Sequence, residues 1–162
     1  MTTHTARPLP SAALRELRVR DDAGRPMAPF TDEEGGSPLR CCLRHSVPGE
    51  RIALVSYAPL RRWAAGTGTD PGAYDEVGPV FVHAGECSGP EGGSLPFTGA
   101  RRAVRRYSAD GRILGGRLVE DPAGAEPAFA DAFAEAFADP EVALVHVRAV
   151  EYGCFLYEVR RP

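Results

Sequence analysis

The sequence has 162 residues, a formal net charge of −3, and 43% hydrophobic and 25% charged residues. This length fits one globular domain, and this composition excludes a fibrous or globally disordered chain. No segment approaches the roughly 18 apolar residues of a membrane span, and the N-terminal region mixes Arg, Asp, Glu and Pro where a signal peptide would carry an apolar block. We therefore expect a cytoplasmic protein that does not bind membranes.

The basic residues are unusual in kind. All 19 are Arg, and the sequence contains neither Asn nor Gln. This bias is typical of a GC-rich genome, so the abundance of Arg is weak evidence for phosphate or carboxylate recognition. With 22 acidic residues against 19 Arg, the chain has no excess positive charge to attract nucleic acid. We expect no nucleic-acid partner, and the oligomeric state stays open.

The chain contains four cysteines, Cys41, Cys42, Cys87 and Cys154. Cytoplasmic redox conditions favour free thiols, metal ligation or catalysis over disulfides. Adjacent Cys41 and Cys42 would also form a strained bridge with each other. We interpret all four as thiols.

The N-terminal quarter of the chain carries weak signals for regular structure. We expect a loose segment over residues 1–13, followed by a single α+β domain over residues 14–162. Residues 14–20 partly alternate and predict a first strand, with a short helix as the alternative. Residues 21–38 are rich in Gly, Pro and acidic residues, which predicts a connecting loop.

Two strands are predicted in the middle of the chain. Residues 51–58 form a mostly apolar run that ends before Pro59, which is typical of a core strand. Residues 61–73 contain Gly, Thr, Asp and Pro and predict a loop. Residues 76–84 are rich in β-formers, but Pro79 has no amide proton and so belongs at the start or the edge of that strand.

A long loop and a hairpin follow. Residues 85–99 contain five glycines and two prolines, which predicts a segment without regular structure and a candidate lid or rim of a site. The β-rich runs 103–107 and 113–119 flank an Asp110-Gly111 pair. Asp-Gly between such runs is a strong hairpin signal.

In residues 126–138 the spacing of the apolar residues changes from that of a strand to that of a helix. Phe129, Phe133 and Phe137 recur every four residues within residues 126–138, which predicts an amphipathic helix with its aromatic stripe on a sheet. Asp139-Pro140 ends this helix.

The C-terminal residues predict a β-hairpin. Residues 141–150 and 154–160 are β-rich and are joined by a short segment that contains Gly153. One principal helix among several hairpin-linked strands indicates an α+β fold with a mainly antiparallel sheet.

The alternation within residues 141–150 suggests a functional face. It places His146 and Arg148 on one side of the strand and only small apolar residues on the other. A pocket that holds His83, His146, Arg148 and Tyr57 would suit acid–base chemistry on an anionic small molecule, with Arg148 as the anion anchor and Tyr57 as a hydrogen-bond donor. The alternative is a solvated outer face or a satisfied core histidine.

Cys42 is a candidate nucleophile. It lies between Arg40 and Arg44 with His45 close by, and cations lower the pKa of a neighbouring thiol. The alternative is a small buried apolar residue, because cysteine is commonly buried.

A zinc site is a further alternative. Cys42 and His45, together with His83 and Cys87, offer two thiolates and two imidazoles, which suffice for a tetrahedral site. The two pairs lack the repeated Cys-x-x-Cys knuckle that identifies zinc sites securely. We therefore predict no cofactor, with zinc as the alternative.

Several short motifs, spread over nearly the whole chain, resemble a known bacterial family. They are Cys42-x-x-His45, Pro48–Glu50 before Leu54–Tyr57, Tyr74 with Gly78–Val82, His146–Arg148, Gly153–Phe155 and Arg160. The family is called domain of unknown function 1203, and its name brings no established activity. The resemblance implies a stand-alone small domain. It also implies a recurrent pattern of residues, namely Tyr57, Tyr74, Gly78, Pro79, Arg148 and Cys154.

These observations lead to one leading hypothesis and two alternatives. The leading one is a cofactor-independent enzyme that performs acid–base chemistry on an anionic or polar small molecule, with Arg44, Tyr74 and Arg160 as further ligand-binding candidates. The first alternative is a non-catalytic module that binds a ligand or a partner. The second is a thiol or zinc protein.

Overall fold

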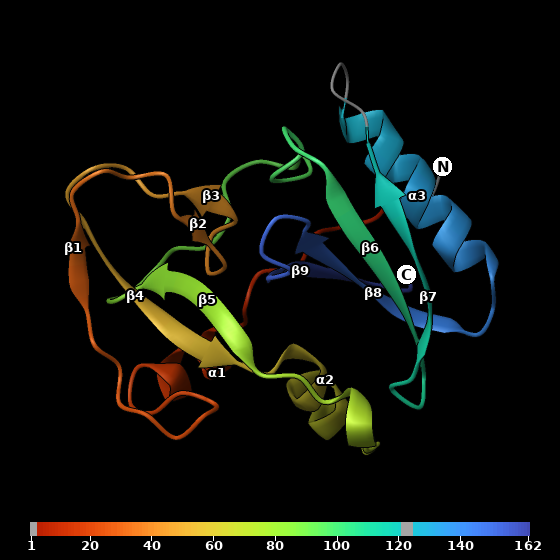
Figure 1. Ribbon diagram of the computed structural model, residues 1–162, viewed down its shortest axis with the longest axis horizontal. Helices are drawn as coiled ribbons and strands as arrows, with labels where there is room; N and C mark the ends of the chain where they lie inside the picture. Colours follow the sequence, from red (N-terminus) through yellow and green to blue (C-terminus); the bar gives the residue numbers. More distant parts are fainter. Residues whose placement is uncertain (1–2, 121–124) are drawn as a thin grey trace.

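The computed structural model describes residues 3–120 and 125–162, which form two mostly antiparallel β-sheets with three α-helices (Figure 1). This arrangement confirms the predicted α+β class. None of the described helices has the length and apolar character that a bilayer span requires. In chain order the elements are α1 (Ser11–Leu17), β1 (Phe30–Asp32), β2 (Pro38–Leu39), β3 (Arg44–His45), β4 (Glu50–Tyr57), α2 (Pro59–Thr67), the 3₁₀ helix η1 (Gly72–Tyr74), β5 (Gly78–His83), β6 (Arg102–Ser108), β7 (Ile113–Val119), α3 (Ala125–Ala138), β8 (Val142–Ala149) and β9 (Phe155–Arg160).

The first sheet has five strands in the order β1-β4-β5-β2-β3. Its centre is the antiparallel pair β4 and β5, which confirms the two strands predicted in the middle of the chain. Pro79 lies at the start of β5, where its missing amide proton costs least. The short strand β2 pairs with β5 in parallel, with Leu39 opposite Phe81.

The second sheet has four strands in the order β7-β6-β8-β9. The hairpin β6–β7 turns through Gly111, whose φ of 78° is a left-handed conformation that glycine adopts without steric cost. The predicted C-terminal hairpin is confirmed as β8–β9. Residues 85–99 contain no helix or strand, as predicted.

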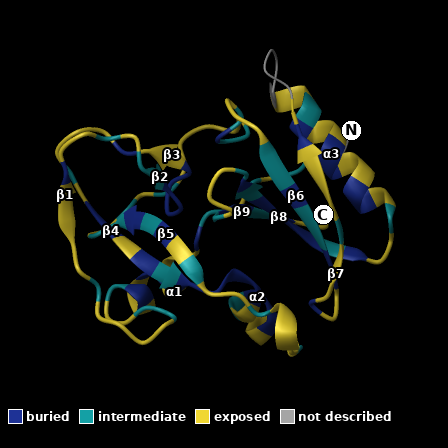
Figure 2. Cartoon of the chain, viewed as in Figure 1, coloured by how far each residue is buried: buried dark blue, intermediate teal, exposed yellow. Residues whose placement is uncertain are grey.

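Helix α3 covers one face of the second sheet. Phe129, Phe133 and Phe137 are buried together with Val145 and Val147 of β8, which confirms the aromatic stripe. Figure 2 shows buried and exposed segments alternating along α3, as expected for a helix with one buried face. This stripe and the sheet make the main hydrophobic core.

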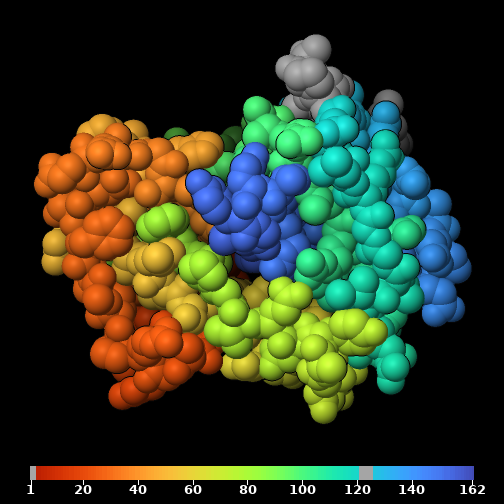
Figure 3. All heavy atoms as spheres, viewed as in Figure 1, coloured from red at the N-terminus to blue at the C-terminus, as the bar shows by residue number. Residues whose placement is uncertain are grey.

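The two sheets meet near the start of β9. Phe155 belongs to the core of the first sheet, and its ring stacks on Tyr57 at 5.8 Å between centroids. Arg40, buried just after β2, donates a hydrogen bond from Nε to the carbonyl oxygen of Phe155 at 2.8 Å. In Figure 3 the blue segment that joins β8 and β9 lies between the orange-to-yellow and the teal parts of the chain.

The predictions for the N-terminal region are partly wrong. Residues 14–17 form the end of α1, the helix expected as the alternative to a strand, because Ala13, Leu14 and Leu17 place their side chains on one buried helical face. Residues 18–20 follow the helix and form no strand. Residues 1–13 were expected to be loose, yet α1 begins at Ser11 and Leu9 is buried with its amide bonded to Arg40. Met1 and Thr2 lie outside the described residues.

Two predicted loops contain regular structure. Within residues 21–38, β1 pairs with β4 and β2 begins at Pro38. Within residues 61–73, most of the helix α2 was missed. Pro59 fits its first turn, and the spacing of Leu60, Trp63 and Ala64 buries one face.

Candidate metal centre

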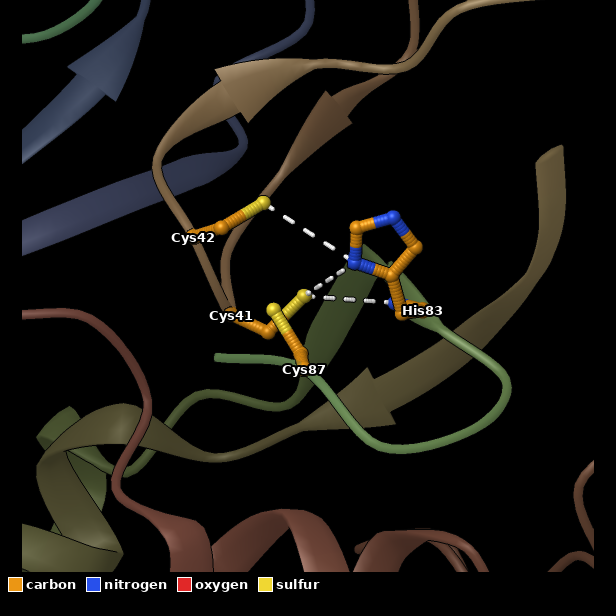
Figure 4. A group of neighbouring side chains, drawn as sticks. All are labelled: Cys41, Cys42, His83 and Cys87. Atoms are coloured by element: carbon orange, nitrogen blue, oxygen red, sulfur yellow. Dashed lines mark hydrogen bonds between the residues drawn. The ribbon is translucent and has the colours of Figure 1, made fainter. Parts of the chain in front are cut away.

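Three cysteines and one histidine come together at one end of β5. The ligand atoms of Cys41, Cys42, His83 and Cys87 all lie within 4.8 Å of one another. Figure 4 shows the three sulfur atoms on the Nδ1 side of the His83 ring. Both Cys41 and Cys42 are buried, and the other two are half-buried.

The sheet topology brings these residues together. Cys41 and Cys42 lie in the tight turn between β2 and β3, where Leu43 has a φ of 58°. His83 is the last residue of β5, and Cys87 follows in the long loop. Because β2 pairs in parallel with β5, the turn after β2 lies beside the end of β5.

The distances suit a tetrahedral metal ion. Nδ1 of His83 lies 3.3 Å from Sγ of Cys41 and 3.9 Å from Sγ of Cys42. Metal–sulfur bonds of about 2.3 Å and metal–nitrogen bonds of about 2.0–2.1 Å at tetrahedral angles require a sulfur–nitrogen separation of about 3.6 Å. The two observed distances lie on either side of that value, so His83, Cys41 and Cys42 are spaced as ligands of one ion.

Hydrogen bonds around the group fix its orientation. Nε2 of His83 lies 3.0 Å from Oε1 of Glu50, which leaves Nδ1 and its lone pair for a metal. Arg44 donates to both carboxylate oxygens of Glu50, at 3.0 and 2.6 Å. The backbone N–H of His83 donates to Sγ of Cys41 at 3.3 Å. The imidazole is therefore held by a carboxylate that is itself held by a guanidinium.

The thiols differ in acidity. A hydrogen bond from Cys41, assisted by the nearby His83 and Arg44, lowers the pKa of Cys42 to about 6 although burial opposes ionisation. The hydrogen bond to Cys42 and burial raise the pKa of Cys41. The hydrogen bonds from Arg44 hold the pKa of Glu50 well below its usual range, so that this carboxylate is charged at neutral pH. These surroundings therefore favour ionisation of Cys42, the form in which a thiol binds a metal.

A cavity of about 590 Å³ gives access to this group. Its lining includes Cys42, His83 and Cys87, together with Arg44 and Glu50. The metal-ligating atoms are thus next to a space from which an ion can enter.

The predicted ligand set needs one correction. Cys42, His83 and Cys87 belong to the group, but His45 does not, and Cys41 occurs in its place. His45 is exposed on β3, and its ring packs edge-to-face on Phe97 at 5.2 Å between centroids. Sequence reasoning missed Cys41 because the only signal was its position next to Cys42.

His146 is buried in the second sheet and not exposed in a pocket. Its ring lies 4.7 Å from that of Tyr107 and 5.0 Å from that of Phe155, between centroids. Within the described ranges neither ring nitrogen has a hydrogen-bond partner, and Oε2 of Glu158 is 3.6 Å from Nε2. Burial lowers the pKa of His146 and favours the neutral ring. Both faces of β8 are core here, which differs from the functional face expected from its alternation.

The four residues of the expected acid–base pocket are dispersed. Tyr57 pairs with Gly78 at one end of β5 and His83 pairs with Ile52 at the other. Five residues of strand separate these positions by about 16 Å. Tyr57 and Arg148 share a different cavity of about 180 Å³, so the structure brings together only these two. The chemical roles of all four stay predictions.

The remaining candidates occupy three different places. Tyr74 is partly exposed on η1. Arg160 donates to Glu158 and lines a cavity of about 460 Å³ with Tyr57. Arg44 lies beside the metal-ligating group. The structure therefore does not collect them into one ligand site.

Comparison with known proteins identifies the family and nothing more specific. The sequence model of the family described as "Protein of unknown function (DUF1203)" matches residues 36–161. No curated protein and no solved structure matches the chain.

Proposed function

The chain belongs to the DUF1203 family, whose name carries no activity, and we propose from its site that it binds one zinc ion through Cys41, Cys42, His83 and Cys87. The observation that carries this proposal is the approach of three sulfur atoms and one imidazole nitrogen to within 4.8 Å of one another.

The donor set favours zinc over other common ions. Ca²⁺ and Mg²⁺ prefer oxygen ligands, whereas thiolate and imidazole suit Zn²⁺. Three cysteines and one histidine are a standard ligand set of structural zinc sites, in which four protein ligands close the coordination shell.

The surroundings support the same assignment. Metal-bound histidines usually donate their second ring N–H to a carboxylate, as His83 does to Glu50. Three thiolates on Zn²⁺ leave one net negative charge, and the guanidinium of Arg44, which also pairs with Glu50, lies close enough to Cys42 and Cys87 to attract it.

The ion would act as a structural clamp. It would join the turn between β2 and β3, the end of β5 and the loop that contains Cys87. Residues 85–99 have no helix or strand, so this clamp would anchor a loop that otherwise depends on few backbone hydrogen bonds.

Metal content of purified variants tests the proposal. Zinc-supplemented full-length protein should contain about one zinc per chain, and Cys87→Ser and His83→Ala should lose it. His45→Ala and Cys154→Ser are matched controls that should keep it. Circular dichroism at a temperature below the melting point checks that each variant is folded. Zinc-free wild type, or a control variant that loses the ion while folded, would refute the assignment.

A further inference from the structure

A second site lies at the opposite end of β5 from the metal-ligating group. It is a cavity of about 180 Å³ at the junction of the two sheets, lined by Tyr57, Glu76, Arg148 and Cys154 among others. Tyr57 ends β4, Glu76 precedes β5, and the other two come from β8 and the segment before β9. Junctions of this kind are common places for small-molecule sites.

An ion-pair network borders the cavity, whose own charged lining residues are Glu76 and Arg148. Oε2 of Glu76 accepts a hydrogen bond from Arg148 at 2.8 Å, and Oε1 accepts one from Arg105 at 2.7 Å. Two guanidiniums therefore share the carboxylate of Glu76, one from Arg148 in the cavity lining and one from Arg105 outside it. The side chain of Arg148 is only 12% exposed, so solvent screens its charge poorly.

Arg148 retains donors for a ligand. Its Nε donates to the carbonyl oxygen of Gly153 at 2.9 Å, and Nη2 donates to Glu76. These contacts use two of the five N–H groups of a guanidinium. No other acceptor for Arg148 occurs within residues 3–120 and 125–162, so the rest of the planar fork is available to a carboxylate.

Two further groups bear on the binding of an anion in the cavity. The hydroxyl of Tyr57 has no hydrogen-bond partner in the described ranges, and burial raises its pKa, so it stays a donor. The guanidinium of Arg40, close to Cys154, is buried against backbone carbonyl oxygens and pairs with no described carboxylate. The hydroxyl of Tyr57 belongs to a cavity-lining residue, whereas Arg40 lies outside the lining, and the carboxylates of Glu158 and Asp22 also act on Tyr57.

We propose that this cavity binds a small monocarboxylate, with the guanidinium of Arg148 on the carboxylate and the hydroxyl of Tyr57 as a second donor. The volume sets the size of the ligand. A water occupies about 30 Å³ of liquid, so the cavity holds about six waters and therefore a ligand of acetate to lactate size. This site is separate from the zinc proposal and does not depend on it.

Amide and Arg Nε NMR titrations of the full-length protein test the site. Sodium acetate and sodium lactate should give saturable shifts of Arg148 Nε–H, Gly78 and Phe155. Acetamide and sodium chloride at equal concentration should give none. Shifts that fail to saturate, or that acetamide reproduces, would overturn the proposal.

Two variants with opposite expected effects separate binding from structure. Arg148→Met should weaken acetate binding at least tenfold, while Arg15→Met, a control on an exposed face of α1, should leave it unchanged. Glu76→Gln should tighten binding several-fold, because it removes the carboxylate that competes for both guanidiniums. If the ion pairs were only structural, Glu76→Gln would lower the melting temperature without tightening binding, and this outcome would contradict the site even if Arg148→Met did not fold.

Discussion

His146 is a neutral residue of the core, and its contribution to stability depends on pH. Burial lowers its pKa, and the charged groups around it are Glu158 on β9, Arg105 on β6 and Arg148 on β8. The unfolded chain then binds a proton near pH 6.5 that the folded chain binds only at lower pH. Stability from this group is therefore fully present above about pH 6.5 and is lost as the pH falls.

His146→Phe should remove this part of the pH dependence. Urea unfolding at pH 7.5 and pH 5.5 would measure it, and the difference in unfolding free energy between the two pH values should be smaller in the variant. Tyr152→Phe, at an exposed position, is a control that removes no imidazole. An equal pH dependence in wild type and His146→Phe would show that folding leaves the pKa of His146 unchanged, which contradicts the lowered pKa.

Glu50 acts on the proposed zinc ion through His83. Glu50→Gln keeps the shape of the side chain but weakens the acceptor for Nε2, so we expect zinc affinity to fall about 10–100-fold. Competition with a chromogenic chelator measures it. Glu91→Gln, at the rim of the same cavity, should change the affinity little. If both variants bound zinc with equal affinity, Glu50 would have no role in positioning His83.

The sequence identified three of the four metal-ligating residues. Cys42, His83 and Cys87 follow from residue type and rough spacing. Cys41 replaces His45 because β2 pairs in parallel with β5, a contact between strands that are distant in the chain. No local pattern signals that pairing in a strand of two residues.

At the scale of elements, α3 stabilises the second sheet through its aromatic stripe. Phe133 is fully buried among sheet and helix side chains, so Phe133→Ala should lower the unfolding free energy by about 3–5 kcal/mol. Glu135→Ala, on the exposed face with a surface ion pair to Arg117, should cost less than about 1 kcal/mol. Denaturant unfolding of both variants decides the matter, and similar losses would contradict this packing.

Elements long enough to repeat their hydrophobic period several times were predictable, and shorter elements were not. The phenylalanine repeat of α3, the apolar run of β4 and the alternation of β8 extend over enough residues to be recognised. Helix α1 has seven residues and β1 has three, so neither repeats its period often enough. In α2 the glycines and threonine at its end led to the prediction of a loop, although the residues around Trp63 form a buried helical face.

At the scale of the molecule, Arg40 links the two sheets. Its guanidinium is buried and donates to the carbonyl oxygens of Pro38 and Phe155. Arg40→Met would leave both oxygens without this donor, and we expect a loss of about 2–4 kcal/mol of unfolding free energy. Arg25→Met, on an exposed loop, is the control. A loss within 0.5 kcal/mol of that control, on the order of ordinary surface changes, would mean that Arg40 does not join the sheets.

The sequence predicted the class of the fold but not its division into two sheets. Each hairpin is a local feature, and residue patterns locate it. Whether β5 pairs with β2 or with a strand of the second sheet depends on contacts across the whole chain. This division separates His146 from His83, whereas Tyr57 and His83 lie at opposite ends of one strand pair, and neither separation can be read from alternation alone.

The central claim is a zinc ion with three sulfur ligands and one nitrogen ligand, and X-ray absorption at the zinc edge tests it most directly. For the zinc-loaded full-length protein we predict three sulfur atoms at about 2.3 Å and one nitrogen at about 2.0–2.1 Å. In Cys41→Ser one sulfur should be replaced by oxygen or nitrogen, whereas His45→Ala should leave the spectrum unchanged. A first shell of nitrogen and oxygen with fewer than three sulfurs in the wild type would contradict the claim.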